Sequence, residues 1–267
     1  MAIANALKFP LIAVDVGNSR VKFGVFEHPL GELLPHPQRA LAAALDQFED
    51  EIQGWLPSGP EHYHWSIASV NRPATGRLIK WLQERRVPNV QLLSHAHLPV
   101  QIDLPRADLV GLDRLANAVS VNLLRAANEP AIIVDMGTAN KVDLVSATGA
   151  FSGGAILPGL SMSAQALHQF TDLLPIVEVE ESPAPLGKST LAAMSSGLYW
   201  GSVGAVRELI ARLSDGPTAT QVFLTGGTAP RFVSVLGHEA ERPPQFVPHL
   251  TLAGIALAAL RAEPTKG

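Results

Sequence analysis

The sequence predicts a mixed α/β fold made of two related halves, and three observations support that prediction. The chain has 267 residues, which at roughly 150 residues per domain corresponds to about two domains. Short apolar segments rich in β-branched residues alternate with segments of helical spacing. An apolar run that ends in Asp, one further residue and Gly occurs at Asp15 and again at Asp135, which suggests a duplicated domain.

Composition excludes several classes of partner and site. The net charge is −4, so no broad basic surface is expected to attract nucleic acid. The chain has no cysteine, which excludes disulfides, thiolate nucleophiles and Cys-ligated zinc. The apolar stretch 250–260 is shorter than the ~20 residues of a membrane-spanning helix. We therefore expect a cytoplasmic protein with no membrane partner.

The first half opens on a predicted β-hairpin. The run 11–14 is apolar and β-branched, the segment 15–19 is typical of a turn, and a second apolar run follows at 21–26. Apolar periodicity and turn residues then predict, in order, a helix at 38–56, a loop at 57–64, a strand at 65–70, a helix at 75–86, a strand at 90–94, a loop at 98–110 and a helix at 113–127.

The second half repeats the opening pattern. An apolar run begins at Ala131, leads into the Asp135 turn and is followed by a second apolar run. The remaining predicted elements are a turn-rich loop that holds Gly153-Gly154 and Pro158-Gly159, a long helix at 190–213, a strand at 222–228 that ends in a double glycine, a helix that starts at Pro230, and a closing helix at 251–262.

Three glycine turns at strand ends indicate phosphate binding. Turns at Gly17, Gly137 and Gly226-Gly227 allow backbone N–H groups to approach phosphate oxygens closely. Asp15 and Asp135 stand at two of these strand ends, and carboxylates together with phosphate oxygens are the usual ligands of Mg²⁺. The pattern predicts that the two aspartates handle a metal–nucleotide complex between the two halves.

Three other kinds of site are not supported. Gly187-Lys188-Ser189 resembles the end of a P-loop, but the required first glycine is replaced by Ser182. The nine histidines show no metal-ligand spacing, and no Gly-x-Ser-x-Gly elbow is present. The predicted chemistry therefore rests on aspartates, a metal ion and backbone amides.

Together the segments closely resemble the type III pantothenate kinase family of the actin–hexokinase–Hsp70 superfamily. The resemblance covers nearly the whole chain, and it is specific because order and approximate spacing agree. The matching segments are Asp15-Val16-Gly17-Asn18-Ser19, Gly111-Leu112-Asp113-Arg114, Asn117-Ala118-Val119, Asp135-Met136-Gly137-Thr138-Ala139, Gly153-Gly154-Ala155-Ile156, Pro158-Gly159, Leu173-Leu174-Pro175, Gly187-Lys188-Ser189-Thr190, Met194, Gly197 and Thr225-Gly226-Gly227.

The resemblance implies a fold and an activity. The fold would be two ribonuclease-H-like (actin-like ATPase) domains, 1–128 and 129–267, with the nucleotide in the cleft between them. The first would carry the first phosphate loop, and the second would carry the second phosphate loop, the adenosine turn and a dimer helix. The activity would be ATP-dependent phosphorylation of pantothenate to 4'-phosphopantothenate, the first step of coenzyme A biosynthesis, in a homodimer.

The resemblance also assigns roles to residues. Asp113 would accept the hydroxyl proton, Asp15 would act through Mg²⁺, and Asp135 would bind a monovalent cation, K⁺ or NH₄⁺. The ATP-binding positions would be Asp15, Gly17, Asn18, Ser19, Lys22, Gly137, Thr138, Gly226 and Gly227. The pantothenate-binding positions would be Gly111, Leu112, Arg114 and Thr190, with the Arg114 guanidinium suited to bind the carboxylate through its planar fork.

Three residues depart from the family pattern. Asn140 and Lys141 stand where hydroxyl residues are usual, and Leu104 stands where an aromatic residue is frequent. We hypothesise that the Lys141 ammonium partly replaces the monovalent cation near Asp135; the alternative is that Lys141 points into solvent. Leu104 leaves the shape of the pantothenate pocket open.

Two other functions are alternatives at this level. One is a non-catalytic regulatory or accessory homologue, which the presence of Asp15, Asp113 and Asp135 argues against. The other is a small-molecule kinase of the same fold with a different substrate, and the Gly111–Arg114 segment favours pantothenate over it.

Overall fold

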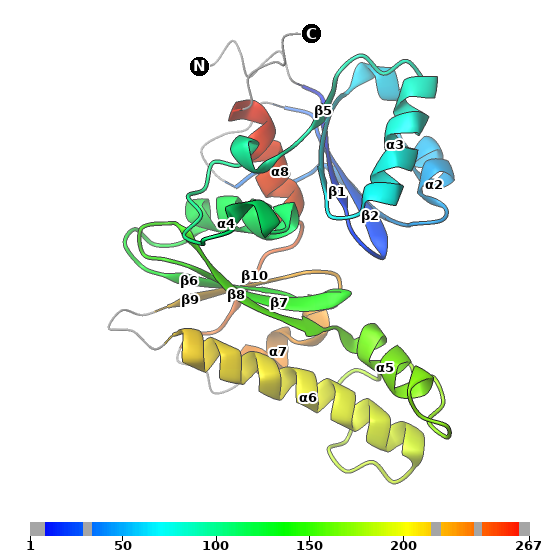
Figure 1. Ribbon diagram of the computed structural model, residues 1–267, viewed down its shortest axis with the longest axis vertical. Coiled ribbons are helices and arrows are strands. Elements are labelled where there is room, and N and C mark those ends of the chain that lie inside the picture. Colours follow the sequence, from blue (N-terminus) through cyan, green and yellow to red (C-terminus); the bar gives the residue numbers. More distant parts are fainter. Residues whose placement is uncertain (1–8, 29–33, 215–219, 238–241, 262–267) are drawn as a thin grey trace. The chain divides into compact units, whose positions relative to one another are not determined.

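The computed structural model describes residues 9–28, 34–214, 220–237 and 242–261 (Figure 1). The chain forms two compact units, each with its own five-stranded sheet. Unit 1 consists of the chain up to Leu124 together with the chain from His249 onward, and unit 2 is Arg125–Pro248. Within the described ranges, no helix is both long and apolar enough to cross a membrane.

Unit 1 is a mixed sheet with helices on both faces. Its strand order is β3-β2-β1-β4-β5, with β1, β2 and β3 antiparallel to their neighbours and β4 and β5 added in parallel. The helices α2 and α3 cover one face, and α4 and α8 cover the other. The elements are β1 (Leu11–Val16), β2 (Arg20–Phe26), β3 (Arg39–Ala44), α2 (Phe48–Trp55), β4 (His64–Ser69), α3 (Arg72–Glu84), β5 (Val90–Leu92), α4 (Leu112–Leu124) and α8 (Leu250–Arg261), with short 3₁₀ turns at Pro60–His62, His95–His97 and Ala107–Leu109.

Unit 2 repeats this topology strand for strand. Read from its other edge, the order β10-β9-β6-β7-β8 is the same as that of unit 1, with the same alternation of antiparallel and parallel pairs. The helices α6 and α7 pack on the apolar face of this sheet. The elements are β6 (Ala131–Asp135), β7 (Ala139–Val145), β8 (Phe151–Pro158), α5 (Leu160–Gln169), α6 (Thr190–Leu213), β9 (Gln221–Thr225), a 3₁₀ turn at Ala229–Arg231 that contains Pro230, α7 (Val233–Gly237) and β10 (Gln245–Phe246).

The helix predicted at 38–56 is wrong in its first half. Residues 39–44 form β3, the edge strand of sheet 1, and only Phe48–Trp55 is helical. The alanine-rich segment favours a helix locally, but its backbone pairs with β2, from Arg39 opposite Val25 to Ala44 opposite Arg20. Strand pairing satisfies the backbone of both segments at once, and this tertiary gain outweighs a propensity difference of less than ~1 kcal/mol per residue.

The turn-rich loop predicted around Gly153-Gly154 and Pro158-Gly159 is also wrong, because residues 151–158 form β8. This strand pairs antiparallel with β7, and the register of the pair shifts between Asp143 and Val145 of β7. A Cβ at Gly154 would lie 2.2 Å from the Val142 oxygen, so glycine is needed there to bring the two backbones together. The glycines that suggested turns therefore mark a close strand approach.

The closing helix belongs to unit 1. The sequence placed the helix 251–262 in the second half. In the structure, the chain returns to unit 1 at His249, and α8 packs on α4 and β1. Residue 262 lies outside the described residues. Two buried hydrogen bonds secure it: Ser120 Oγ donates to the Leu250 oxygen at 2.7 Å, and Thr251 Oγ1 donates to Asn117 Oδ1 at 2.8 Å. The other predicted helices and strands are confirmed within a few residues of their expected ends.

The packing of α8 on α4 generates a stability prediction. A Cβ at Gly254 would lie 1.9 Å from the backbone oxygen of Ala116, so Gly254→Ala forces the two helices apart. We expect it to lower the free energy of unfolding by about 1–3 kcal/mol or more. Gly76→Ala in α3, where nothing lies within 4 Å, is the matched control and is expected to raise stability by about 0.5–1 kcal/mol. Urea denaturation measures both, and equal effects would contradict the packing argument.

Candidate active site

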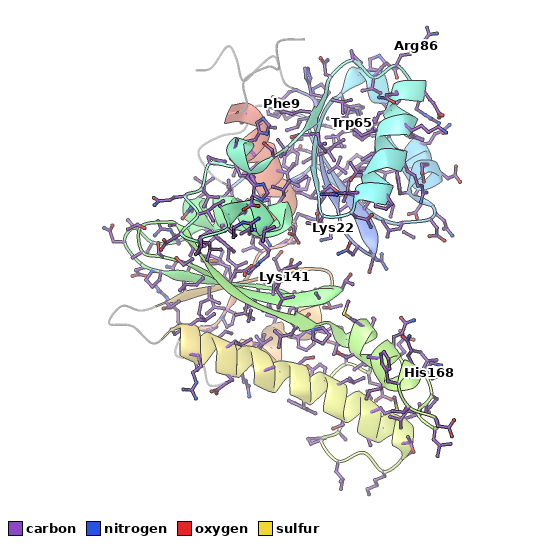
Figure 2. The ribbon with its side chains drawn as sticks, viewed as in Figure 1. Phe9, Lys22, Trp65, Arg86, Lys141 and His168 are labelled. Carbon is purple, nitrogen blue, oxygen red and sulfur yellow. The ribbon has the colours of Figure 1, made fainter. Side chains whose placement is uncertain are left out.

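The first candidate phosphate turn lies between β1 and β2. Asp15 is 4% exposed near the end of β1, and its Oδ2 is 3.1 Å from Lys22 Nζ on the opposite strand (Figure 2 labels Lys22). The two residues are direct cross-strand partners, which fixes the pair. The turn is closed by Gly17 N, which donates to the Arg20 oxygen at 3.0 Å, while Asn18 and Ser19 lie exposed at its tip. Exposed turn residues beside a buried carboxylate suit contact with a phosphate.

Asn71 holds this turn from the neighbouring strand end. Its Nδ2 donates to the Gly17 oxygen at 3.2 Å, and its Oδ1 accepts from Ala74 N at 3.1 Å and so caps α3. The sequence interpretation missed Asn71. The signal was present, because Asn followed two residues later by Pro73 is typical of a helix start.

Asp113 lies in the first turn of α4, directly after Gly111-Leu112. A Cβ at Gly111 would be 2.5 Å from Asp113 Oδ1 and 3.4 Å from Cγ1 of Val70, the residue after β4, so the carboxylate folds back over the glycine. The segment before Gly111 is held by His95, whose Nε2 lies 2.8 Å from the Val110 oxygen. Glycine therefore makes the space in which the Asp113 carboxylate sits.

The neighbouring predicted substrate residues divide by burial. Arg114 is half-buried, and its backbone N donates to the Gly111 oxygen at 3.1 Å. Leu112 is buried on the packed face of α4, so its side chain contributes to the core. Leu104 is half-buried in the segment that precedes the Ala107–Leu109 turn. Of these three, only Arg114 has a charged side chain.

One histidine of unit 1, His249, has an altered pKa. Partial burial lowers the pKa of His249 below its usual value, and His36 and Lys22 act in the same direction. His249 is therefore neutral at neutral pH and adds no positive charge beside Lys22. The Lys22 ammonium is then the cation opposite Asp15.

The second candidate phosphate turn has the same design in unit 2. Asp135 is 5% exposed at the end of β6, and its Oδ2 is 2.9 Å from Lys141 Nζ on β7 (Figure 2). Lys141 does not point into solvent, since only 18% of its side chain is exposed. Gly226 has φ +101°, and a Cβ there would lie 2.6 Å from Asp135 Oδ1 and 2.2 Å from the Met136 oxygen. Only glycine allows the β9 turn to approach the carboxylate this closely.

The N-terminus of α5 meets the same turn. Gly159 N donates to the Thr138 oxygen at 3.0 Å, and a Cβ at Gly159 would lie 2.1 Å from the Gly137 oxygen. The N-terminal end of a helix carries a partial positive charge. Thr138 and Gly227 are exposed at this place, so unit 2 presents hydroxyl and backbone groups there.

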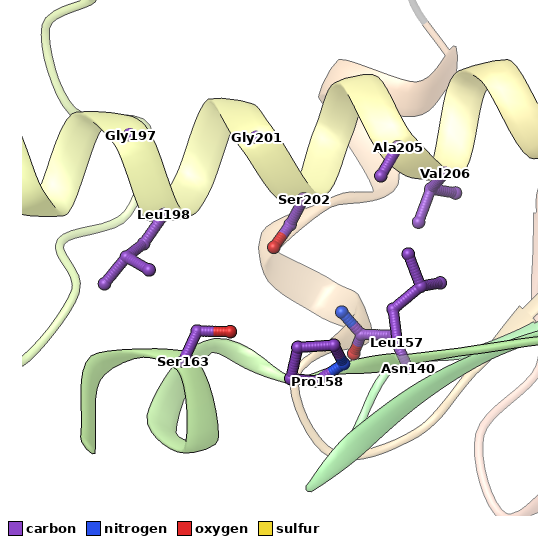
Figure 3. Close-up of a pocket in the computed structure, with 10 residues that line it drawn as sticks. All are labelled: Asn140, Leu157, Pro158, Ser163, Gly197, Leu198, Gly201, Ser202, Ala205 and Val206. Atoms are coloured by element: carbon purple, nitrogen blue, oxygen red, sulfur yellow. The ribbon is translucent and has the colours of Figure 1, made fainter. Parts of the chain in front are cut away.

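Thr190 and Asn140 lie at two hollows along α6. Thr190 is exposed as the first residue of the helix and lines an open hollow together with Leu174, Met194 and Gly197. Asn140 faces a second hollow of about 230 Å³, and its buried Oδ1 has no hydrogen-bond partner among the described residues (Figure 3). Alternation along β7 puts Asn140 and Lys141 on opposite faces of the sheet, so only Lys141 reaches Asp135.

The donor set fits a metal shared with a nucleotide. In the ranges that the structure describes, no three His, Asp or Glu side chains group closely enough to hold a metal ion. Mg²⁺ typically binds one or two carboxylates together with substrate phosphates and water, and it needs no larger protein cage. Asp15 is a carboxylate of this kind at the first turn.

Comparison with known proteins settles the family. The family model described as "Type III pantothenate kinase" matches residues 11–212. The chain belongs to the type III pantothenate kinase family. It is 34% identical to the type III pantothenate kinase of Gluconobacter oxydans over 94% of this chain and 93% of that protein. It is 32% identical to the one of Rhodospirillum rubrum over 95% and 99% of the two chains.

Solved structures place the chain in the actin-like ATPase fold. It is similar to a putative 2-dehydro-3-deoxygalactonokinase from Sinorhizobium meliloti, with a TM-score of 0.55 at 15% identity over 93% and 98% of the two chains. It is also similar to the activator of 2-hydroxyisocaproyl-CoA dehydratase from Clostridium difficile, with a TM-score of 0.52 at 12% identity over 94% of each chain. The predicted fold class is confirmed.

The contact of Gly111 with Asp113 generates a prediction for this kinase. Gly111→Ala places a methyl group where the Asp113 carboxylate lies, so the carboxylate must move. Displacement of a reacting group by about 1 Å costs up to ~10²-fold in rate, and we expect kcat to fall by at least about tenfold. Gly59→Ala is the matched control, since a Cβ there meets the Glu61 carboxylate at 2.2 Å, before the start of β4 and at the opposite end of sheet 1 from the Asp15 turn. Steady-state kinetics and thermal unfolding should show similar stability for both variants and a rate loss for Gly111→Ala alone; equal kcat values would contradict the positioning role.

Proposed function

We propose that this chain transfers the γ-phosphoryl group of ATP to the primary hydroxyl of pantothenate, giving 4'-phosphopantothenate for coenzyme A biosynthesis. The observation that carries the proposal is family membership across 11–212, a range that includes both aspartate turns and Asp113. The family uses ATP and a divalent metal, and Asp15 with the phosphate oxygens would hold Mg²⁺. When bound, Mg²⁺ neutralises charge that develops on the transferred group.

Asp113 is the proposed base. Its carboxylate is fixed over Gly111, on a rigid helix start, which supports a positioned proton acceptor. Phosphoryl transfer has a loose transition state, so the hydroxyl proton can leave late and a carboxylate is basic enough to accept it. Arg114 follows directly and would bind the pantothenate carboxylate with two parallel hydrogen bonds. Gly111 and Leu112 would complete this part of the pocket through their backbone, and Thr190 would add a hydroxyl.

The two turns are the proposed phosphate-binding elements. Backbone N–H groups at Gly17 and at Gly137, with the hydroxyl of Thr138, would donate to phosphate oxygens. Lys22, on β2, keeps 36% of its side chain exposed while it pairs with Asp15, and its ammonium would lie near a phosphate bound at this turn. Gly226-Gly227 would form the turn that faces the adenosine.

The base assignment is tested by Asp113→Asn in an ATP-dependent phosphorylation assay with pantothenate. Asparagine keeps the size of the side chain but accepts no proton, so we expect kcat to fall by about 10²–10⁴-fold while ATP affinity is retained. Isothermal titration with ATP and Mg²⁺ checks the affinity.

Asp108→Asn is the control for Asp113→Asn. Asp108 is exposed in the preceding segment, and its hydrogen bond with the Arg106 guanidinium lowers the pKa of its carboxyl. The substitution removes one negative charge near α4 without touching the proposed site, and kcat should change by less than about twofold. Equal rates for wild type and Asp113→Asn would refute the base assignment.

We further propose that the exposed face of α6 forms a homodimer interface. Gly197, Gly201 and Gly204 lie on one face of this helix, and a Cβ at any of them would have no neighbour within 4 Å. Each glycine costs about 1 kcal/mol of helix stability relative to alanine, and nothing within the described chain requires it. A second chain packed closely on this face would account for the three glycines.

The interface is tested by Gly201→Arg. A long charged side chain on the glycine face should block close approach and halve the mass measured by light scattering after gel filtration. Gly54→Arg in α2 is the control, because Gly54 is also an exposed helical glycine with open space around it. An unchanged mass for Gly201→Arg would contradict this interface.

A further inference from the structure

The ion pair between Asp135 and Lys141 bears on which cations the enzyme requires. The two residues are direct partners across β6 and β7, so the hairpin holds the ammonium at the carboxylate. The Nζ–Oδ2 distance is 2.9 Å, and the side chains are 18% and 7% exposed. A carboxylate this deeply buried is stable only when an opposite charge or hydrogen bonds compensate it. Here the chain supplies that charge itself.

The surroundings of Asp135 leave little room for a separate cation. Oδ2 is in contact with the Lys141 ammonium, and Oδ1 lies so close to the β9 turn that a Cβ on Gly226 would be only 2.6 Å from it. The family resemblance implies K⁺ or NH₄⁺ at this carboxylate, but a free cation on Oδ2 would have to displace an ammonium of the same charge. The residues present therefore do not fit an added monovalent cation at this place.

We propose that the Lys141 ammonium is a built-in substitute for the monovalent cation, so that the kinase needs no added K⁺ or NH₄⁺. Polyphosphate at the Gly137 turn would otherwise be repelled by the Asp135 carboxylate, and one fixed positive charge removes that repulsion. A lysine ammonium carries the same single charge as NH₄⁺ and donates three hydrogen bonds. Its tether to β7 removes the entropic cost of capturing a free ion.

The pair at the first turn shows that the arrangement is a property of the hairpin. Lys22 faces Asp15 from the equivalent position on β2, at 3.1 Å. Its side chain is 36% exposed, twice the exposure of Lys141. The less exposed lysine is held against its carboxylate, which suits a charge that substitutes for a bound ion.

The test compares the rate of pantothenate phosphorylation in the presence of different cations. Because it measures this rate, it rests on the proposed function. ATP and buffer are supplied as tetramethylammonium salts, and KCl or NH₄Cl is then added at constant ionic strength. Wild type should change by less than about twofold. Lys141→Ala should lose at least about tenfold in tetramethylammonium and regain most of it with K⁺ or NH₄⁺. Lys80→Ala, which removes an exposed lysine of α3, should behave as wild type.

Two results would overturn the proposal. One is a wild-type rate that rises tenfold or more on addition of K⁺ or NH₄⁺, a measurement that needs no variant to fold. The other is a Lys141→Ala enzyme that matches wild type in tetramethylammonium. The affinity for ATP with Mg²⁺, measured in the same salts, gives a second readout. If wild type phosphorylates no pantothenate in any of these salts, the proposed function fails. The effect of added K⁺ or NH₄⁺ on the affinity for ATP with Mg²⁺ still decides the role of Lys141.

Discussion

The pairing of a buried aspartate with a lysine on the adjacent strand is the interaction on which both units depend. Each central strand ends in a carboxylate, Asp15 or Asp135, that leaves water on folding. Residues directly opposite in an antiparallel pair lie about 5 Å apart, so one lysine on the second strand compensates the charge. Slippage by one residue would break the ion pair and turn the apolar side chains of the strand away from the core. Charge and packing therefore specify the same register.

Glycines, which have no Cβ atom, allow the short distances around these carboxylates. Gly226 lets the β9 turn reach Asp135, Gly159 brings the N-terminus of α5 against Gly137, and Gly111 makes room for Asp113. In each case the approaching group is on a strand or at a helix end, which limits its motion. Phosphoryl transfer depends mainly on positioning and on the neutralisation of charge. A site built from close backbone approaches and fixed ion pairs suits that chemistry.

Local patterns predicted elements well where a segment contains the information for its own structure. The helix at 190–213 is found over that same range, the first hairpin is found within two residues of its expected ends, and the second hairpin begins at Ala131 as expected. The segments 39–44 and 151–158 are different, because each is an edge strand whose backbone is satisfied by a neighbour. Asn71 and His95 were missed for a related reason. Their side chains position the site by hydrogen bonds to backbone oxygens. Motif spacing in a sequence shows which side chains are present, but it does not show which distant backbone groups they contact.

The sequence alone determined the duplicated α/β pattern, the glycine turns, the aspartates that end the central strands and the resemblance to the kinase family. These follow from residue type and order, which local sterics and apolar periodicity translate directly. Only the tertiary structure decided that α8 returns to unit 1, where Gly254 packs against α4. It also decided that Lys141 faces Asp135 and does not point into solvent. Both outcomes depend on which distant backbones come together, and the burial and pairing gained there exceed the preference of any single segment.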